Sequence, residues 1–220
     1  MLFAKLTEVL DPEPHCAALN MAIDEVLLRR AADPLLRIYR WARPAISFGY
    51  FEKVSGVARP GCEWEMVRRW TGGGIVLHGE DVTYTLIVPA AHGFMARSAR
   101  ESYREIHECI AGTLRAAGVA TSLVASAAAK VSADCFENPV EADLLAGSRK
   151  IAGAAQRRTR WGLLHQGSVQ GVSLAGNFAA QLAVAFAAEV ASRPLSGEEV
   201  AEAQLLAAEK YGSEAWLRRF

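Results

Sequence analysis

Residues 147–157 have the sequence Gly-Ser-Arg-Lys-Ile-Ala-Gly-Ala-Ala-Gln-Arg, and the rest of the chain is best understood outward from them. They predict a strand over 149–157, in which side chains alternate between two faces. On one face we expect Lys150, Ala152, Ala154 and Gln156. Glycine and alanine build a poor core but let a ligand or another backbone come close. One interpretation is a lysine ammonium at the mouth of a narrow apolar slot, which suits a fatty chain ending in a carbonyl. The other is an edge strand with a solvated lysine.

A lone cysteine precedes this strand. Cys135 falls in an Ala- and Ser-rich segment, residues 125–140, that is longer than most connections in compact domains. Such loops tend to carry function or to move. Cys135 is in this segment, and an ordinary loop thiol is its plain interpretation.

A second informative stretch is the run Gly72-Gly73-Gly74, which follows a pair of arginines. Three glycines between strands permit positive φ and leave backbone N–H groups free to receive an anionic or carbonyl oxygen. The run lacks the Gly-Lys-Ser/Thr ending of a P-loop, and no helix follows it as in a dinucleotide fingerprint. Tight hairpins also use glycine, so the run alone does not establish a site. His78 closes the next strand and is expected to face the same cavity.

The other elements follow from periodicity and capping signals. Helices are expected from Asn20 to the Asp33-Pro34 stop, from Ser98 or Ser102 to Ala117, near 178–191, and after a capping box of Ser196 and Glu199. Strands are expected at 35–40, 45–50, 65–70, 75–78, 83–88 and 163–169. No repeat, linker or composition break divides the chain, which predicts a single domain over residues 1–220.

Composition narrows the class of protein. Hydrophobic residues make up 51% of the chain and charged residues 22%, which predicts a packed core. The formal net charge of +0 argues against a dedicated nucleic-acid binder. No stretch approaches the roughly 20 apolar residues of a membrane span, and the first residues lack a long apolar run after a basic patch, so we do not expect a signal peptide. The cysteines have neither C-x-x-C nor metal-site spacing, so we expect a reduced, cytoplasmic protein without a metal. They are Cys16, Cys62, Cys109 and Cys135.

Four motifs in order resemble those of the lipoate–protein ligase and octanoyltransferase family, whose catalytic domain is shared with biotin ligases. The first resembles the family's opening helix, and the second its arginine–glycine–histidine signature. The third resembles its lysine strand, with one extra residue before the lysine, and the fourth its closing motif. They are Asn-Met-Ala-Ile-Asp-Glu at 20–25, Arg-Arg-Trp-Thr-Gly-Gly-Gly-Ile-Val-Leu-His at 68–78, the stretch at 147–157, and Lys-Tyr-Gly-Ser-Glu-Ala-Trp at 210–216. The match covers nearly the whole chain.

The resemblance implies an α/β (α+β) fold with a mixed, largely antiparallel sheet flanked by helices. It implies one catalytic domain over residues 1–220, without a C-terminal accessory domain. In the family the motif lysine holds the acyl carbonyl, and that role falls to Lys150. The residues expected to bind substrate are Arg69, Gly72, Gly73, Gly74, His78, Gly153 and Ala155.

The cysteine-dependent octanoyltransferases are the branch that the chain resembles most, through Cys135 in the loop before the lysine strand. That branch implies transfer of an octanoyl or lipoyl group from an acyl carrier protein, through a Cys135 thioester and without a cofactor. The acceptor would be a lysine of a lipoyl carrier domain, such as glycine cleavage H protein or a dehydrogenase E2 subunit. A lysine ammonium near the thiol would favour the thiolate and stabilise the oxyanion.

Two alternatives stay open. One is an ATP-dependent lipoate ligase that uses ATP and Mg and has a separate accessory subunit. The other is a non-catalytic protein that binds octanoate or lipoate on the same fold. One departure from the transferase pattern bears on the site: this chain has His165-Gln166 where the pattern has Gln-His. Neighbours on a strand point to opposite faces, so His165 is not assigned a catalytic role.

Overall fold

The computed structural model describes residues 1–57, 63–126, 134–174 and 176–220. Cys62 and part of the predicted 125–140 loop lie outside these residues. Among the described residues, no helix is long and apolar enough to cross a membrane. The same part of the chain contains no cluster of three or more His, Cys, Asp or Glu side chains suited to a metal ion.

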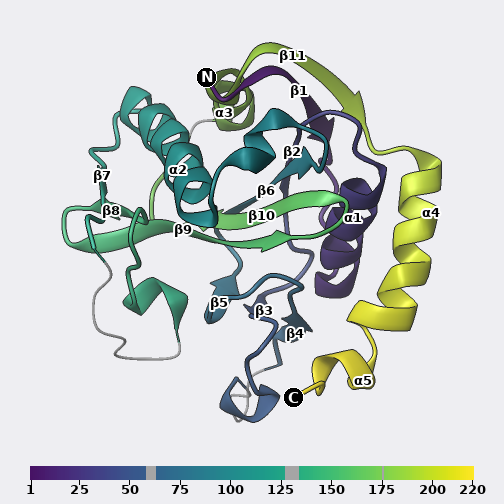
Figure 1. Ribbon diagram of the computed structural model, residues 1–220. Helices are drawn as coiled ribbons and strands as arrows, with labels where there is room; N and C mark the ends of the chain where they lie inside the picture. The colour runs from purple at the N-terminus through teal and green to yellow at the C-terminus, as the bar shows by residue number, and fades with distance from the viewer. Residues whose placement is uncertain (58–62, 127–133, 175) are drawn as a thin grey trace.

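An eight-stranded sheet forms the centre of the molecule (Figure 1). Its second strand, β1, is parallel to both of its neighbours, and every other pairing in this sheet is antiparallel. In spatial order the strands are β11 (Ala187–Pro194), β1 (Phe3–Leu10), β2 (Leu35–Tyr39), β6 (Val82–Pro89), β10 (Gly162–Val169), β9 (Arg149–Arg158), β8 (Leu144–Ala146) and β7 (Ser122–Leu123). This mixed, largely antiparallel sheet confirms the predicted fold class.

Helices cover the two faces of the large sheet (Figure 1). On one face, α2 (Ala99–Ala116) and α3 (Phe178–Phe186) pack over β6, β9 and β10 in one hydrophobic core. On the other face, α1 (Ala17–Arg30) and α4 (Gly197–Leu206) pack in a second core. The capping boxes at Ser98–Glu101 and Ser196–Glu199 are both formed, which satisfies N–H groups at the starts of α2 and α4.

A smaller sheet of three strands lies beside the α1 side of the large sheet. Its order is β4 (Glu65–Arg68), β3 (Ala45–Phe48) and β5 (Ile75–His78). Ala45 and Val67 of this sheet belong to the same core as α1, so the two sheets are joined by apolar packing. The triglycine turn connects β4 to β5, and the short helical turn η3 (Cys135–Glu137) contacts β5 and β9.

The C-terminal half contains one error of prediction. The Ala-rich segment 178–191 was expected to be a single helix, but α3 ends at Phe186 and β11 follows at once. β11 pairs in parallel with β1, from Phe3↔Ala187 to Leu10↔Pro194. The high helix propensity of alanine is therefore overridden by the backbone hydrogen bonds that β1 offers at the edge of the sheet.

Candidate active site

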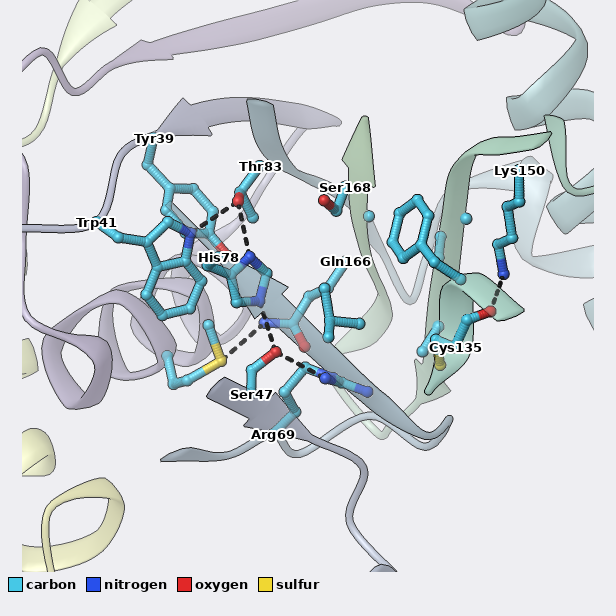
Figure 2. Close-up of a pocket in the computed structure, with 17 residues that line it drawn as sticks. Tyr39, Trp41, Ser47, Arg69, His78, Thr83, Cys135, Lys150, Gln166 and Ser168 are labelled. Carbon is cyan, nitrogen blue, oxygen red and sulfur yellow. Dashed lines mark hydrogen bonds between the residues drawn. The ribbon is translucent and has the colours of Figure 1, made fainter. Parts of the chain in front are cut away.

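A pocket opens between the large sheet, the small sheet and η3. The empty space between its walls is about 470 Å³, counting the open mouth. Figure 2 shows that Lys150 and Cys135 lie together at one end and that a group of polar and aromatic side chains lies at the other. The pocket therefore has a chemically reactive end and a second, polar end.

Lys150 reaches the pocket because of a β-bulge. Leu144 pairs with Ala152, whereas the next residue, Leu145, pairs with Lys150, so Ile151 is an extra residue on β9. Paired residues on antiparallel strands share a face, and the bulge therefore puts Lys150 on the face opposite Ala152. The predicted alternation, with Lys150 on the face of Ala152, Ala154 and Gln156, is wrong for Lys150.

The ammonium of Lys150 is buried and paired. Its Nζ lies 2.7 Å from Oδ2 of Asp143, and the two side chains are 4% and 0% exposed. It also donates to the backbone carbonyl of Cys135 at 2.8 Å. Asp143 is held in turn by Tyr103 of α2, whose hydroxyl donates to Oδ1 at 2.5 Å, and by the Val140 N–H at 2.7 Å. The interpretation of a solvated edge lysine is therefore wrong.

Gly153 makes room for this lysine. A methyl group at position 153 would lie 2.5 Å from Cε and 2.7 Å from Nζ of Lys150. Only glycine lets the ammonium lie over the strand at this point.

The thiol of Cys135 lies against the triglycine turn. Its Sγ accepts a hydrogen bond from the Gly74 N–H at 3.0 Å. Gly73 has a φ of +85°, which favours glycine, and a methyl group there would lie 3.3 Å from Nη2 of Arg69 and 3.7 Å from Sγ of Cys135. The turn thus separates a guanidinium from the thiol by a single glycine.

Arg69 holds the turn in shape. Its Nη2 donates to the carbonyls of Gly72 at 3.0 Å and Gly74 at 2.8 Å, and its Nη1 donates to the Ser47 hydroxyl at 2.7 Å. Burial lowers the pKa of Arg69, and the nearby Cys135 acts in the opposite direction. A buried cation close to the sulfur is suited to a site where negative charge develops.

His78 lies at the polar end of the pocket. Its Nδ1 lies 2.8 Å from Oδ2 of Asp81, its Nε2 lies 2.7 Å from the Ser47 hydroxyl, and its ring stacks on Trp41 at 4.0 Å. Burial lowers the pKa of His78, although the hydrogen bond to Asp81 opposes this. A neutral imidazole then donates from Nδ1 to the carboxylate and accepts at Nε2 from Ser47.

His165 and Gln166 lie on opposite faces of β10, as the strand alternation predicted. Gln166 lines the pocket, where it accepts from Thr71 at 2.8 Å and donates to Asp24 at 2.8 Å. His165 is buried below α2, with Tyr84 at 3.2 Å and Gln156 at 3.0 Å. Burial holds the pKa of His165 well below its usual range.

The structure brings most of the predicted residues together. Pocket walls are formed by Arg69, His78, Cys135, Lys150, Gly153 and Ala155. Gly72 and Gly73 line a neighbouring cavity that shares Ala154 and Ala155 with this pocket, and Gly74 contributes its N–H to Cys135.

Sequence reasoning missed several residues of the site, chief among them Asp143, Tyr103, Ser47 and Gln166. Asp143 is the only one with a local signal, because it is an acidic residue just before the hairpin that carries Lys150. The others reach the site from distant elements.

The molecule is an α/β domain in which a mixed sheet with flanking helices surrounds a pocket, and a cysteine, a buried lysine and a glycine turn meet at that pocket. The family profile of the lipoyl protein ligase A/B catalytic domain matches residues 16–192, and the chain belongs to this family. It is 36% identical over 171 residues to "Octanoyltransferase LipM" of Oceanobacillus iheyensis, across 73% of this chain and 62% of the relative. The chain thus spans about three fifths of the length of that relative.

Solved structures share the fold. Lipoate-protein ligase A bound with ATP superposes with a TM-score of 0.79 at 20% identity, over 99% of both chains. Protein Ta0514 of T. acidophilum with bound lipoic acid superposes with a TM-score of 0.77 at 20% identity, over 100% of both chains. At this identity the likeness concerns the fold alone.

Proposed function

We propose that the protein is an acyltransferase that moves an octanoyl or lipoyl group onto a lysine of a lipoyl carrier domain, through a thioester on Cys135. The observation that carries the proposal is the setting of Cys135 at one end of the pocket. Its sulfur meets the Gly74 N–H at 3.0 Å, and the buried Lys150 ammonium lies 2.8 Å from its backbone carbonyl. The similarity to relatives named octanoyltransferase supports the same reaction.

The reaction has two steps. In the first, the Cys135 thiolate attacks the thioester carbonyl of an acylated carrier protein, a C–S bond to Cys135 forms, the C–S bond to the carrier breaks, and the carrier leaves as its thiolate. In the second, the ε-amine of the acceptor lysine attacks the Cys135 thioester. A C–N bond forms, the C–S bond breaks, and the proton lost by the amine balances the released Cys135 thiolate. No redox partner or cofactor is required.

Lys150 and Gly74 are the proposed donors to the oxyanion. An ammonium carries three N–H donors, and Asp143 and the Cys135 carbonyl account for two of them. The described residues show no acceptor for the third, and we assign it to the acyl oxygen; the Gly74 N–H lies next to the reacting sulfur. Fixed donors in a water-poor site stabilise such an oxyanion by several kcal/mol.

The acyl chain would occupy the pocket beyond this reactive end. Arg69, His78, Gly153 and Ala155 would form its walls, and Gly72, Gly73 and Gly74 would shape its rim. The acyl donor would be an acyl carrier protein, and the acceptor a lipoyl domain such as H protein or a dehydrogenase E2 subunit. We also propose that the chain acts as one catalytic domain, because both sheets pack on a common core.

The test is intact-mass measurement after incubation with octanoyl carrier protein. We expect a gain of one octanoyl group, located on Cys135 by peptide mapping. The adduct should be lost in Cys135→Ala and kept in Cys109→Ala, a partly buried thiol on α2 that serves as the control. No adduct, or an adduct that survives Cys135→Ala, would refute the mechanism.

The ATP-dependent ligase makes a different prediction. Lipoate-dependent exchange of pyrophosphate into ATP, in the presence of Mg, would be positive and insensitive to Cys135→Ala. A non-catalytic acyl-binding protein would bind lipoate and yield no product from either donor. The adduct and exchange assays together separate all three functions.

A further inference from the structure

The end of the pocket farthest from Lys150 is made largely of side chains that can form hydrogen bonds. We call it the end wall, and it consists of Tyr39, Trp41, Ser47, His78, Thr83, Gln166 and Ser168 (Figure 2). The Tyr39 hydroxyl donates to Oδ2 of Asp24 at 3.4 Å. A fatty chain with its carbonyl at Cys135 would place its last carbons against these groups. Burial of polar groups against hydrocarbon costs free energy unless they are hydrogen-bonded elsewhere.

Asp81, behind the end wall, takes up one set of donors. Its Oδ2 accepts from the Thr83 hydroxyl at 2.7 Å and from the Ser168 hydroxyl at 2.6 Å, and lies 2.8 Å from Nδ1 of His78. Burial alone would raise the pKa of Asp81, but these hydrogen bonds lower it overall, so it is a carboxylate that only accepts. The indole N–H of Trp41 donates to Thr83 at 2.8 Å.

The remaining donors of the end wall are also used. The Ser47 hydroxyl lies 2.7 Å from Nε2 of His78 and accepts from Arg69. The amide nitrogen of Gln166 donates to Asp24 at 2.8 Å and contacts the Met21 sulfur at 3.5 Å.

Every hydrogen-bond donor of the end wall has a protein partner. Within the described part of the chain, the buried side-chain nitrogen and oxygen atoms without a partner are Nε2 of His107 and Oε1 of Gln181, and neither residue lines this pocket. Arg69 lies between the end wall and Cys135, outside the end wall itself; three of its five N–H groups donate to Ser47, Gly72 and Gly74. The end wall is therefore polar in composition but offers no unused N–H or O–H to a ligand.

We propose that the end wall selects acyl chains that end in hydrocarbon and rejects chains whose far end carries a hydrogen-bond acceptor. An acceptor buried there would lose its water and gain no donor in return. This inference rests on the proposed function, because it takes Cys135 and Lys150 as the carbonyl end of the bound chain. It narrows the substrate class to acyl chains whose far end carries no polar group.

The experiment compares two acids of the same shape, 7-methyloctanoate and 7-oxooctanoate, which differ by a methyl group in place of a carbonyl oxygen. Their dissociation constants for the native protein are measured by calorimetry. We expect 7-oxooctanoate to bind about 10- to 100-fold more weakly. Equal affinities would overturn the inference.

A pair of variants at Thr83 tests the cause. Thr83→Val removes the acceptor of the Trp41 N–H and leaves that donor free in the pocket wall. We expect it to bring the affinity ratio of the two acids toward one, whereas Thr83→Ser, which keeps the oxygen, should retain the ratio. A ratio unchanged in Thr83→Val would refute the role of hydrogen-bond saturation. The ratio in the native protein stands as a test even if one variant does not fold.

The same two chains, supplied as N-acetylcysteamine thioesters, separate this inference from the proposed function. Discrimination between the acids without any Cys135 adduct would refute the transferase and leave the inference intact. Equal adduct rates from both thioesters would support the transferase and overturn the inference. Neither binding nor adduct would overturn both.

Discussion

The strand pair β9–β10 presents one face to the pocket and the other to α2, and the two faces use their side chains differently. On the pocket face, the small residues Gly153 and Ala155 leave space. Gln166 and Ser168, which pair with them on β10, form hydrogen bonds to Asp24 and Asp81. On the α2 face the space is filled by a cluster of polar aromatic side chains. That cluster contains Tyr84, Tyr103, His107 and His165, with ring centroids 4.2 to 5.8 Å apart.

One pair of strands thus carries both the pocket and the packed side chains that hold it in place. The α2 face is filled because its rings pack against one another, whereas the pocket face is open because its side chains are small. Asp143 connects the two, since one carboxylate oxygen meets Lys150 on the pocket face and the other meets Tyr103 of α2. Substitutions on either face, or at this connection, should therefore have separable effects.

The largest effect is expected at Asp143, which serves both faces. Asp143→Ala would leave the Lys150 ammonium buried without its counter-charge, at a cost of about 3–5 kcal/mol in the free energy of unfolding. Urea unfolding measures this cost. The double variant Asp143→Ala/Lys150→Met should recover much of the stability but form no Cys135 adduct. A loss below about 1 kcal/mol in the single variant would show that the pair is not buried as described.

The next effect belongs to the pocket face alone. Gly153→Ala would displace the buried end of Lys150 and place a methyl group 3.1 Å from Oδ1 of Asp143, so we expect a loss of about 1–3 kcal/mol in the free energy of unfolding, less than in Asp143→Ala. Adduct formation on Cys135 should fall about 100-fold, because one oxyanion donor would be misplaced. The rate is measured by quenched-flow mass spectrometry.

The control for Gly153→Ala is Gly112→Ala in α2, where an added methyl group meets nothing within 4 Å. It should leave the adduct rate unchanged. If Gly153→Ala also leaves the rate unchanged, Lys150 has no part in the chemistry.

The smallest effect belongs to the α2 face and appears only in acid. Burial lowers the pKa of His107 to about 4. The unfolded chain takes up this proton near pH 6.5 but the folded protein does not, so stability is lost as pH falls from about 6.5 toward 4. Between pH 7 and pH 5 the loss from His107 amounts to about 2 kcal/mol.

His107→Asn tests this assignment, because asparagine can still donate to the Ala142 carbonyl, which His107 Nδ1 meets at 2.7 Å. Urea unfolding at pH 7 and pH 5 should show a smaller acid loss in this variant, while His92→Asn, outside the cluster, should match the native protein. An acid loss that His107→Asn does not reduce would place the titration elsewhere.

Local sequence signals predicted much of the fold. β5 was predicted at residues 75–78 and β9 within one residue of its end, because alternation and glycine turns are local properties. The capping box of Ser196 and Glu199 was likewise confirmed at the start of α4. Residues 187–191 were predicted wrongly as helix, because their state depends on a partner strand more than 170 residues away in the chain.

The sequence by itself determined the family, the glycine turn, the lysine strand and the face on which His165 lies, since each follows from residues that are neighbours in the chain. Tertiary structure decided which way Lys150 points, because the bulge exists only in the pairing of β9 with β8. It also decided that Asp143 is the partner of that lysine and that the polar groups of the end wall are hydrogen-bonded to other protein groups. Asp143 is held by Tyr103, and Ser47 is held by Arg69 and His78. These contacts depend on how distant segments of the chain pack.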